Sequence, residues 1–321
     1  MSSTTFSDRG PESADWASAG LYYLSRGFFN RHRFGCRVWK ISVDGGFDCP
    51  NRDGSLGNSG CVFCNPASFS PSRRGDLGSI SQQINEGIRK LRARYDADRF
   101  IAYFQPASNT YAPIDELRSK YEEAIVQPEV VGLAIGTRPD CVGDEVLDLL
   151  AELARRTCLS IEYGLQTIHH RSLDWMGRGH HYDAFLQAVD ESRRRGLEVG
   201  AHVILGLPGE SREDMLATAR ELARLRIDFV KIHNLHAVKG TRLAEMVSSG
   251  EVRLQGFAEY VSCAVDFIEE LPPDCVIDRV SGDAPPQYLV EPDWCLDKPA
   301  ILAAVEAEFK RRGTRQGARI A

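Results

Sequence analysis

The chain has 321 residues, 43% of them apolar and 26% charged, which are globular proportions and exclude collagen-like, disordered and coiled-coil classes. Nine cysteines are too dilute for a disulfide-stapled secreted domain, and their odd number leaves at least one thiol unpaired, so they indicate metal binding or catalysis. The net charge, 39 − 45 = −6, argues against a protein that is basic over its whole surface.

The amino-terminal segment, residues 1–20, is predicted to be a flexible leader. It is polar and has no apolar core, so it resembles neither a signal peptide nor an amphipathic transit peptide. No apolar run in the chain approaches the roughly 20 residues that a membrane helix needs. We therefore expect a soluble cytoplasmic protein without a membrane partner.

From residue 21 to about 250, short apolar runs alternate with amphipathic segments, the pattern of parallel strands joined by crossover helices. Leucines at helical spacing predict a helix over 144–154, and Ser211 with Asp214 forms an acidic variant of the capping box at the start of another. This pattern predicts an α/β fold, a partial (β/α)6 TIM-like barrel. The expected strands are 37–43, 100–104, 130–135, 159–163, 199–205 and 229–233.

Residues 251–321 are predicted to form an irregular, α-containing C-terminal extension that packs on or caps the barrel. A helix is expected over 257–271, and a final one from Pro299 to about Arg312. The segment between them is interrupted by several prolines, which cannot donate backbone hydrogen bonds.

The sharpest chemical signal is Cys49-x11-Cys61-x2-Cys64, directly after the first strand and inside the glycine- and asparagine-rich loop 44–70. Loops after barrel strands form the catalytic face, and glycine lets a backbone wrap closely around an inorganic cluster. Three thiolates on an iron–sulfur cubane leave one iron open for another ligand. A zinc site with Cys36 as fourth ligand and a set of plain buried thiols are the alternatives.

These features resemble a radical S-adenosylmethionine (SAM) enzyme, closest to the YhcC-like family, which is related to the radical SAM core of the elongator catalytic subunit. The resemblance covers about residues 20–300. It is carried by the stretches Arg37 to Phe47, Cys61 to Pro66, Gly136 to Cys141, Glu162 to Thr167 and Gly206 to Glu210. The stretch Asp278 to Asp283 also resembles an element of that family, near its substrate side.

The resemblance implies two cofactors. A [4Fe-4S] cluster would be held by Cys49, Cys61 and Cys64, and its open iron would bind the amino and carboxylate groups of SAM. One electron from an external donor such as flavodoxin or ferredoxin would cleave SAM into a 5′-deoxyadenosyl radical, which abstracts hydrogen from an unactivated carbon.

The resemblance also implies contacts to SAM. Phe63 would pack near the adenine, and His202 would reach the ribose. The remaining expected contacts are Ser108, Asn109 and Thr110 at the methionine amine, and Gln166 and Arg178 at the ribose and carboxylate.

Candidates for binding substrate lie directly after the third strand and from the second half of the sixth strand onward, on the same predicted face of the barrel. They are Arg138, Asp140, Lys231, His233 and His236. Turns that are solvated or paired internally are the alternative interpretation of these residues.

Two basic segments flank an acidic body, because residues 21–40 and 309–321 each carry five Lys or Arg and no acid. Aromatic residues interleave with the first set of cations, a combination that suits RNA. Kinship with the elongator core makes a wobble-uridine side chain of transfer RNA the substrate hypothesis. Alternatives are a helix that packs its aromatics and leaves its arginines in water, a small-molecule or protein substrate, and a non-catalytic zinc-stabilised binding protein.

Overall fold

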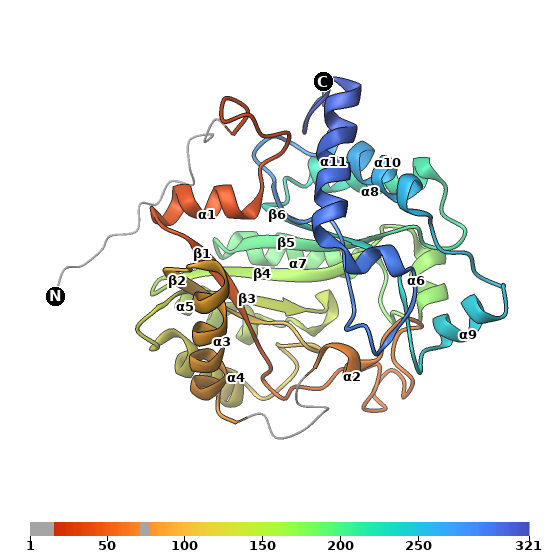
Figure 1. The fold of residues 1–321 in the computed structure, drawn as a ribbon. Helices are drawn as coiled ribbons and strands as arrows, with labels where there is room; N and C mark the ends of the chain where they lie inside the picture. Colours follow the sequence, from red (N-terminus) through yellow and green to blue (C-terminus); the bar gives the residue numbers. More distant parts are fainter. Residues whose placement is uncertain (1–15, 71–77, 321) are drawn as a thin grey trace.

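The computed structural model describes residues 16–70 and 78–320, and its centre is one curled sheet of seven parallel strands (Figure 1). The sheet confirms the expected partial barrel, and each of the six predicted strands is present. Its strands in spatial order are β1 (Val38–Val43), β2 (Arg99–Phe104), β3 (Val130–Thr137), β4 (Cys158–Gln166), β5 (Glu198–Leu205), β6 (Phe229–Asn234) and β8 (Val276–Arg279).

Helices cover the convex side of the sheet and its two ends. Figure 1 shows α3 (Ile80–Tyr95) and α4 (Ile114–Ile125) below the sheet, and α8 (Arg212–Arg224), α10 (Phe257–Glu269) and α11 (Lys298–Arg312) above it. No helix among the described residues combines the length and apolarity needed to cross a membrane. The helices are α1 (Arg26–Phe34), α2 (Pro66–Phe69), α3 (Ile80–Tyr95), α4 (Ile114–Ile125), η2 (Pro139–Cys141), α5 (Asp144–Ala154), α6 (His170–Met176), α7 (Tyr182–Arg194), α8 (Arg212–Arg224), α9 (Arg242–Ser248), α10 (Phe257–Glu269), η3 (Asp293–Leu296) and α11 (Lys298–Arg312).

Local sequence explains where several of these helices begin. Ser211 accepts a hydrogen bond from the Asp214 N–H and Asp214 accepts one from the Ser211 N–H, which confirms the capping box of α8. Asp297 caps α11 by accepting from the Ala300 N–H, just before the predicted start at Pro299.

The predicted extension, 251–321, contributes the seventh strand to the sheet. Val276 and Ile277 are buried and pair with Phe229 and Val230 of β6. The extension also supplies β9 (Leu289–Glu291), which pairs with β7 (Ala237–Val238) as a separate antiparallel ribbon.

The aromatic residues near the start of the chain pack on the protein. Of the predicted leader, residues 1–15 lie outside the described residues, and Trp16 is buried with its indole N–H donating to the Pro273 carbonyl oxygen at 2.9 Å. Tyr22 stacks on Phe309 of α11, and Phe29 of α1 meets Phe229 edge to face. The interpretation of segment 21–40 as a packed helix is therefore correct for these rings.

Charged side chains fill the concave side of the sheet. Glu162 of β4 accepts hydrogen bonds from Lys40 of β1 at 2.5 Å and from Lys231 of β6 at 2.6 Å. Asp278 of β8 lies 3.0 Å from the Lys40 ammonium nitrogen and also pairs with Arg26 of α1. Each of these side chains is at most 15% exposed. Despite burial, Lys231 and Lys40 hold the pKa of the Glu162 carboxyl group well below its usual range, and Arg26 together with the two lysines does the same for Asp278.

We expect Asp278→Asn to lower the free energy of unfolding by about 3 kcal/mol or more, because it leaves buried cations without their counter-charge. Urea unfolding followed by circular dichroism measures the loss. The matched control is Asp274→Asn, an exposed aspartate just before the same strand, which should change stability by less than about 0.5 kcal/mol. Equal losses in the two variants would contradict a stabilising role for the Asp278 ion pairs.

Candidate functional site

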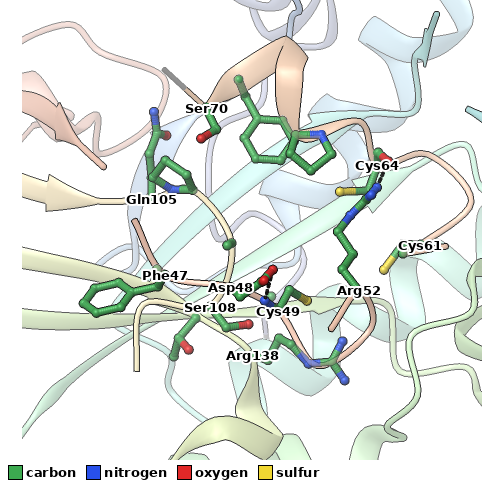
Figure 2. A pocket seen from close by; sticks show the side chains of 18 of the residues that line it. Phe47, Asp48, Cys49, Arg52, Cys61, Cys64, Ser70, Gln105, Ser108 and Arg138 are labelled. Atoms are coloured by element: carbon green, nitrogen blue, oxygen red, sulfur yellow. Dashed lines mark hydrogen bonds between the residues drawn. The ribbon is translucent and has the colours of Figure 1, made fainter. Parts of the chain in front are cut away.

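A cavity opens at the carboxyl ends of the strands, between the loop after β1 and the ends of β3, β4 and β5 (Figure 2). It brings together the three cysteines and most of the residues expected to contact SAM. The predicted site residues that line it are Cys49, Cys61, Phe63, Cys64, Ser108, Arg138, Gln166, Arg178 and His202. Those outside its lining are Asn109, Thr110, Asp140, Lys231, His233 and His236.

Hydrogen bonds to distant segments hold the cysteine loop in place. The Val62 N–H donates to the Met176 carbonyl oxygen at 2.9 Å, and the Leu243 N–H donates to the Val62 carbonyl oxygen at 3.0 Å. The Cys64 N–H donates to the Cys61 carbonyl oxygen at 2.9 Å, which closes a tight turn. The second and third cysteines are therefore fixed relative to α6 and α9.

Three arginines from separate loops line the same cavity. Arg52, Arg138 and Arg178 each keep one buried guanidinium nitrogen that has no hydrogen-bond partner in the described part of the chain. Arg178 also donates to the Cys61 sulfur at 3.4 Å, as does the side-chain amide of Asn51 at the same distance. Cationic donors around a sulfur-lined cavity fit a negatively charged group, such as a cluster with its thiolates or a carboxylate.

The cysteines fit a cluster better than a single ion. Burial raises the pKa of the Cys64 thiol to about 11, and neighbouring Cys61 adds to the rise, so a thiolate there requires a cation. Within 16–70 and 78–320, no three His, Cys, Asp or Glu side chains gather closely enough for one metal ion. A cubane has no such requirement, because each of its thiolates binds a different iron.

The zinc alternative is wrong. It requires Cys36 beside the other three cysteines, but Cys36 precedes β1 and packs near Val38 at the start of that strand. Cys49, Cys61 and Cys64 follow the other end of β1, and a strand of this length spans about 20 Å. The four thiols therefore cannot share one ion.

Gln166 has an unusual backbone conformation at the end of β4. Its φ angle is 74°, and the pairing of β4 with β5 shifts register between Gly164 and Gln166. Such a bulge redirects a side chain, here one that lines the cavity. A Cβ atom on Gly164 would lie 2.9 Å from the side-chain amide nitrogen of Gln166 and 3.1 Å from a guanidinium nitrogen of Arg178. Glycine at this position therefore leaves the space that both side chains occupy.

The three predicted amine contacts after β2 differ in position. Ser108 lines the cavity. The Asn109 side chain donates to the Gly136 carbonyl oxygen at 2.7 Å, and the Thr110 hydroxyl lies 2.7 Å from the Thr137 hydroxyl. Both are buried, and their contacts join the loop after β2 to the end of β3.

Arg138 and Asp140 form an internally paired turn after β3. Two guanidinium nitrogens of Arg138 donate to the two carboxylate oxygens of Asp140, at 2.9 and 2.7 Å. The pair orients Arg138, whose third nitrogen has no partner among the described residues.

The predicted substrate residues of β6 and the loop after it all have partners within the protein. Lys231 donates to Glu162 and, at 2.8 Å, to the Tyr103 hydroxyl. His233 accepts from Arg279 at 2.7 Å, and His236 contacts the backbone of Asn234. Burial, followed by the charge of Arg279, holds the pKa of His233 well below its ordinary value.

His202 connects the cavity to the buried charges. It lines the cavity, and its Nε2 lies 2.9 Å from a carboxylate oxygen of Glu162. Burial and then the charge of Lys231 lower its pKa to about 4, against the opposing effect of Glu162. The imidazole is therefore neutral at pH 7, and its Nε2–H donates to the ionised carboxylate.

Several residues of the site could not be predicted from the sequence. Residues 105–107, Arg52 and Asn51 gave no signal, because their roles depend on which loops meet. Lys40 and Glu162 did carry a signal, since both are charged residues inside predicted parallel strands, which are usually buried on both faces, and buried charges need partners.

Comparison with known protein families agrees with this site. The model of the Radical SAM superfamily matches residues 54–222, and that of the Radical_SAM C-terminal domain matches residues 227–311. The chain therefore belongs to the radical SAM superfamily. It is an enzyme, and the cofactors of its family are a [4Fe-4S] cluster and SAM, as expected from the cysteine loop.

Individual relatives confirm the resemblance to YhcC and to the elongator core. The chain is 38% identical to YtqA of Bacillus subtilis over 298 residues, 92% of each chain, and 36% identical to YhcC of Escherichia coli over 89% of this chain and 92% of that one. It is 28% identical to a tRNA uridine(34) acetyltransferase of Methanocaldococcus jannaschii over 50% of this chain and 30% of the relative. The solved Methanocaldococcus infernus Elp3 has the same fold, with a TM-score of 0.65 and 19% identity over 87% of this chain and 64% of Elp3.

We expect stability to fall between pH 6.5 and pH 4 because of His202. The pKa of His202 is depressed in the folded state, so the unfolded chain takes up a proton first as pH falls. The free energy of unfolding is therefore lower at pH 5 than at pH 7 by about 2 kcal/mol. Urea unfolding at pH 7 and pH 5 measures this loss. In His202→Gln the difference between the two pH values should shrink by about that amount, and an unchanged difference would contradict a neutral, buried imidazole.

We expect Gly164→Ala to weaken SAM binding about tenfold or more, because the added methyl group displaces Gln166 and Arg178 from the cavity. Equilibrium dialysis of the reconstituted protein against labelled SAM measures the affinity. Gly143→Ala is the matched control, since a Cβ atom there meets nothing within 4 Å. Equal affinities in the two variants would show that these side chains do not contact SAM.

Proposed function

We propose that this radical SAM enzyme modifies the side chain of a uridine in transfer RNA. The observation that carries the proposal is the combination of the cysteine- and arginine-lined cavity with similarity to tRNA uridine(34) acetyltransferases through half of the chain. The shared part covers only 30% of that relative. The proposal therefore concerns the radical reaction and includes no acetyl transfer.

Three thiolates and their hydrogen-bond donors would hold the cluster. Cys49, Cys61 and Cys64 would each bind one iron, while Asn51 and Arg178 donate to the Cys61 sulfur. Hydrogen bonds to cluster sulfurs favour the reduced state by stabilising added negative charge. When bound, the cluster and SAM supply a carbon-centred radical that removes a hydrogen atom from the substrate.

The remaining lining residues would bind and orient SAM. Arg178 keeps a buried guanidinium nitrogen for the SAM carboxylate, and Ser108 lies on the side proposed for the amine. His202 donates through Nε2 to Glu162, so its other ring nitrogen is left to accept a hydrogen bond from a ribose hydroxyl. Phe63 provides an apolar ring for the adenine, and Gln166 a second contact to the ribose.

Substrate would approach over the Arg138 turn, where a cationic nitrogen remains for a phosphate or a base oxygen. The paired Asp140 positions this arginine. Lys231 would act indirectly, by holding the Glu162 carboxylate that orients His202. His233 would position Arg279.

Fewer cationic side chains at the two basic ends of the chain are available to RNA than the sequence predicts. In segment 21–40, Arg26, Arg33 and Lys40 are ion-paired within the protein, Arg31 is exposed, and the half-exposed Arg37 pairs with the exposed Asp96. In segment 309–321, Arg311, Arg312 and Arg319 have acidic partners, and Lys310 and Arg315 are exposed.

The electron that starts the radical reaction would come from a small donor protein of the flavodoxin or ferredoxin class.

The test uses transfer RNA from cells that lack this protein. The reconstituted protein, SAM and dithionite should form 5′-deoxyadenosine and change the mass of a uridine nucleoside in digests of that RNA. Cys61→Ala should abolish both products and the brown colour of the cluster. Cys36→Ala is the matched control and should retain them, because its thiol lies at the other end of β1.

Formation of 5′-deoxyadenosine tests the radical chemistry, and the altered nucleoside tests the RNA substrate. Cleavage of SAM without any altered nucleoside would overturn the RNA substrate and favour a small molecule or a protein in its place. Binding of tRNA that does not weaken as salt rises would also count against RNA, since phosphate contacts release counterions.

A further inference from the structure

A second cavity lies at the opposite end of β1 from the cysteines. It has a volume of about 500 Å³ and is bounded by α1, the start of β1, the end of α3 and Asp278 of β8. We call it the edge pocket, because β1 and β8 are the two edges of the open sheet. Figure 1 shows α1 beside the start of β1. A volume of this size holds a ligand as large as a nucleotide.

The edge pocket carries surplus positive charge. Arg26, Arg31, Arg37 and Lys40 line it together with one acid, Asp278, whose carboxylate already pairs with Arg26, Lys40 and Lys231. Arg31 is exposed. Arg37 is half-exposed and contacts the exposed carboxylate of Asp96 at 3.3 Å, and its backbone N–H donates to Asp98.

One of these cations has an unused donor. The Arg26 guanidinium donates to Asp278 through Nε, while its buried Nη2 has no hydrogen-bond partner among the described residues. Guanidinium groups that surround an open space recognise the oxygens of a phosphate, which accepts several hydrogen bonds at once.

A planar aromatic surface lies in the same pocket. Trp39 stacks on Tyr95 with ring centroids 4.0 Å apart and an angle of 14° between the rings. Trp39 is nevertheless 37% exposed, which is unusual for so large a ring, and base stacking on such a surface contributes about 1–3 kcal/mol. Beside it, the Asn30 side chain donates to the Val38 carbonyl oxygen, and its own buried oxygen has no donor in the described part of the chain.

We propose that the edge pocket binds a nucleoside monophosphate unit. The phosphate would lie against Arg26, Arg31 and Arg37, the base would stack on Trp39, and the unpaired oxygen of Asn30 would accept an N–H of the base. A free nucleotide and one nucleotide of an RNA chain share this chemistry. The proposal does not depend on the tRNA reaction, because this site is separate from the cysteine cavity.

The experiment follows the tryptophan fluorescence of the full-length, reconstituted protein during titration with adenosine and uridine 5′-monophosphates, inorganic phosphate and a short single-stranded RNA. Nucleotides should quench the fluorescence, and binding should weaken as salt rises. Arg31→Ala with Arg37→Ala should weaken nucleotide binding at least tenfold. Arg89→Ala with Lys90→Ala, on the exposed face of the neighbouring α3, removes the same charge outside the pocket and should leave binding unchanged.

Two further variants test the ring. Equilibrium dialysis against labelled nucleotide, which does not depend on Trp39 fluorescence, should show about fivefold or more weaker binding for Trp39→Ala and most of the binding retained for Trp39→Phe, while both variants lose most of the fluorescence change. Tighter binding of RNA than of mononucleotide identifies RNA as the source of the ligand, and equal binding identifies a free nucleotide.

Nucleotide binding that survives the Arg31 and Arg37 substitutions would overturn the proposal. Inorganic phosphate that binds as tightly as the nucleotides would also overturn it, because the base would then contribute nothing. All these variants should still cleave SAM, so a failure of the edge pocket is distinguishable from a failure of the proposed reaction.

Discussion

The ion pairs on the concave side of the sheet are the constraint on which the arrangement of this protein depends. A seven-stranded open sheet has two free edges, and its curvature decides where the loops at its carboxyl end meet. Asp278 of β8 pairs across the interior with Lys40 of β1, while Glu162 of β4 pairs with the same lysine and with Lys231. Because an unpaired buried charge is costly, these contacts favour one curvature and so one relative position of the edges.

The same charges reach the cofactor cavity through His202. Glu162 fixes the tautomer of that imidazole and so determines which nitrogen it presents to a ligand. Around the cavity, Gly164 makes room for Gln166 and Arg178, and backbone hydrogen bonds of Val62 hold the cysteine turn. The site is therefore preorganised by strands and loop anchors rather than by the cysteine loop alone, as electrostatic binding of a charged cofactor requires.

Sequence patterns predicted the six strands and the helices at 144–154 and 299–312, because apolar periodicity and helix caps are local properties. The strand β8 was not predicted. Its apolar residues Val276 and Ile277 are followed at once by the charged Asp278 and Arg279, and prolines lie on both sides of the segment. Lys231 was predicted as a substrate-binding candidate, and the structure pairs its ammonium group with Glu162 inside the sheet. The alternation of residues along a strand decides this direction, and only the neighbouring strands define which side is interior.

By itself the sequence determined the class of chemistry, because Cys49, Cys61 and Cys64 lie in one short loop whose spacing is a local feature. It also determined the succession of strands and helices that makes a partial barrel. Only the tertiary structure decided that Cys36 is excluded from the cysteine site, that Arg52 and Arg178 converge on it, and that Asp278 joins the two edges of the sheet. These contacts connect residues that are distant along the chain, and a linear pattern cannot show which of several buried charges will meet.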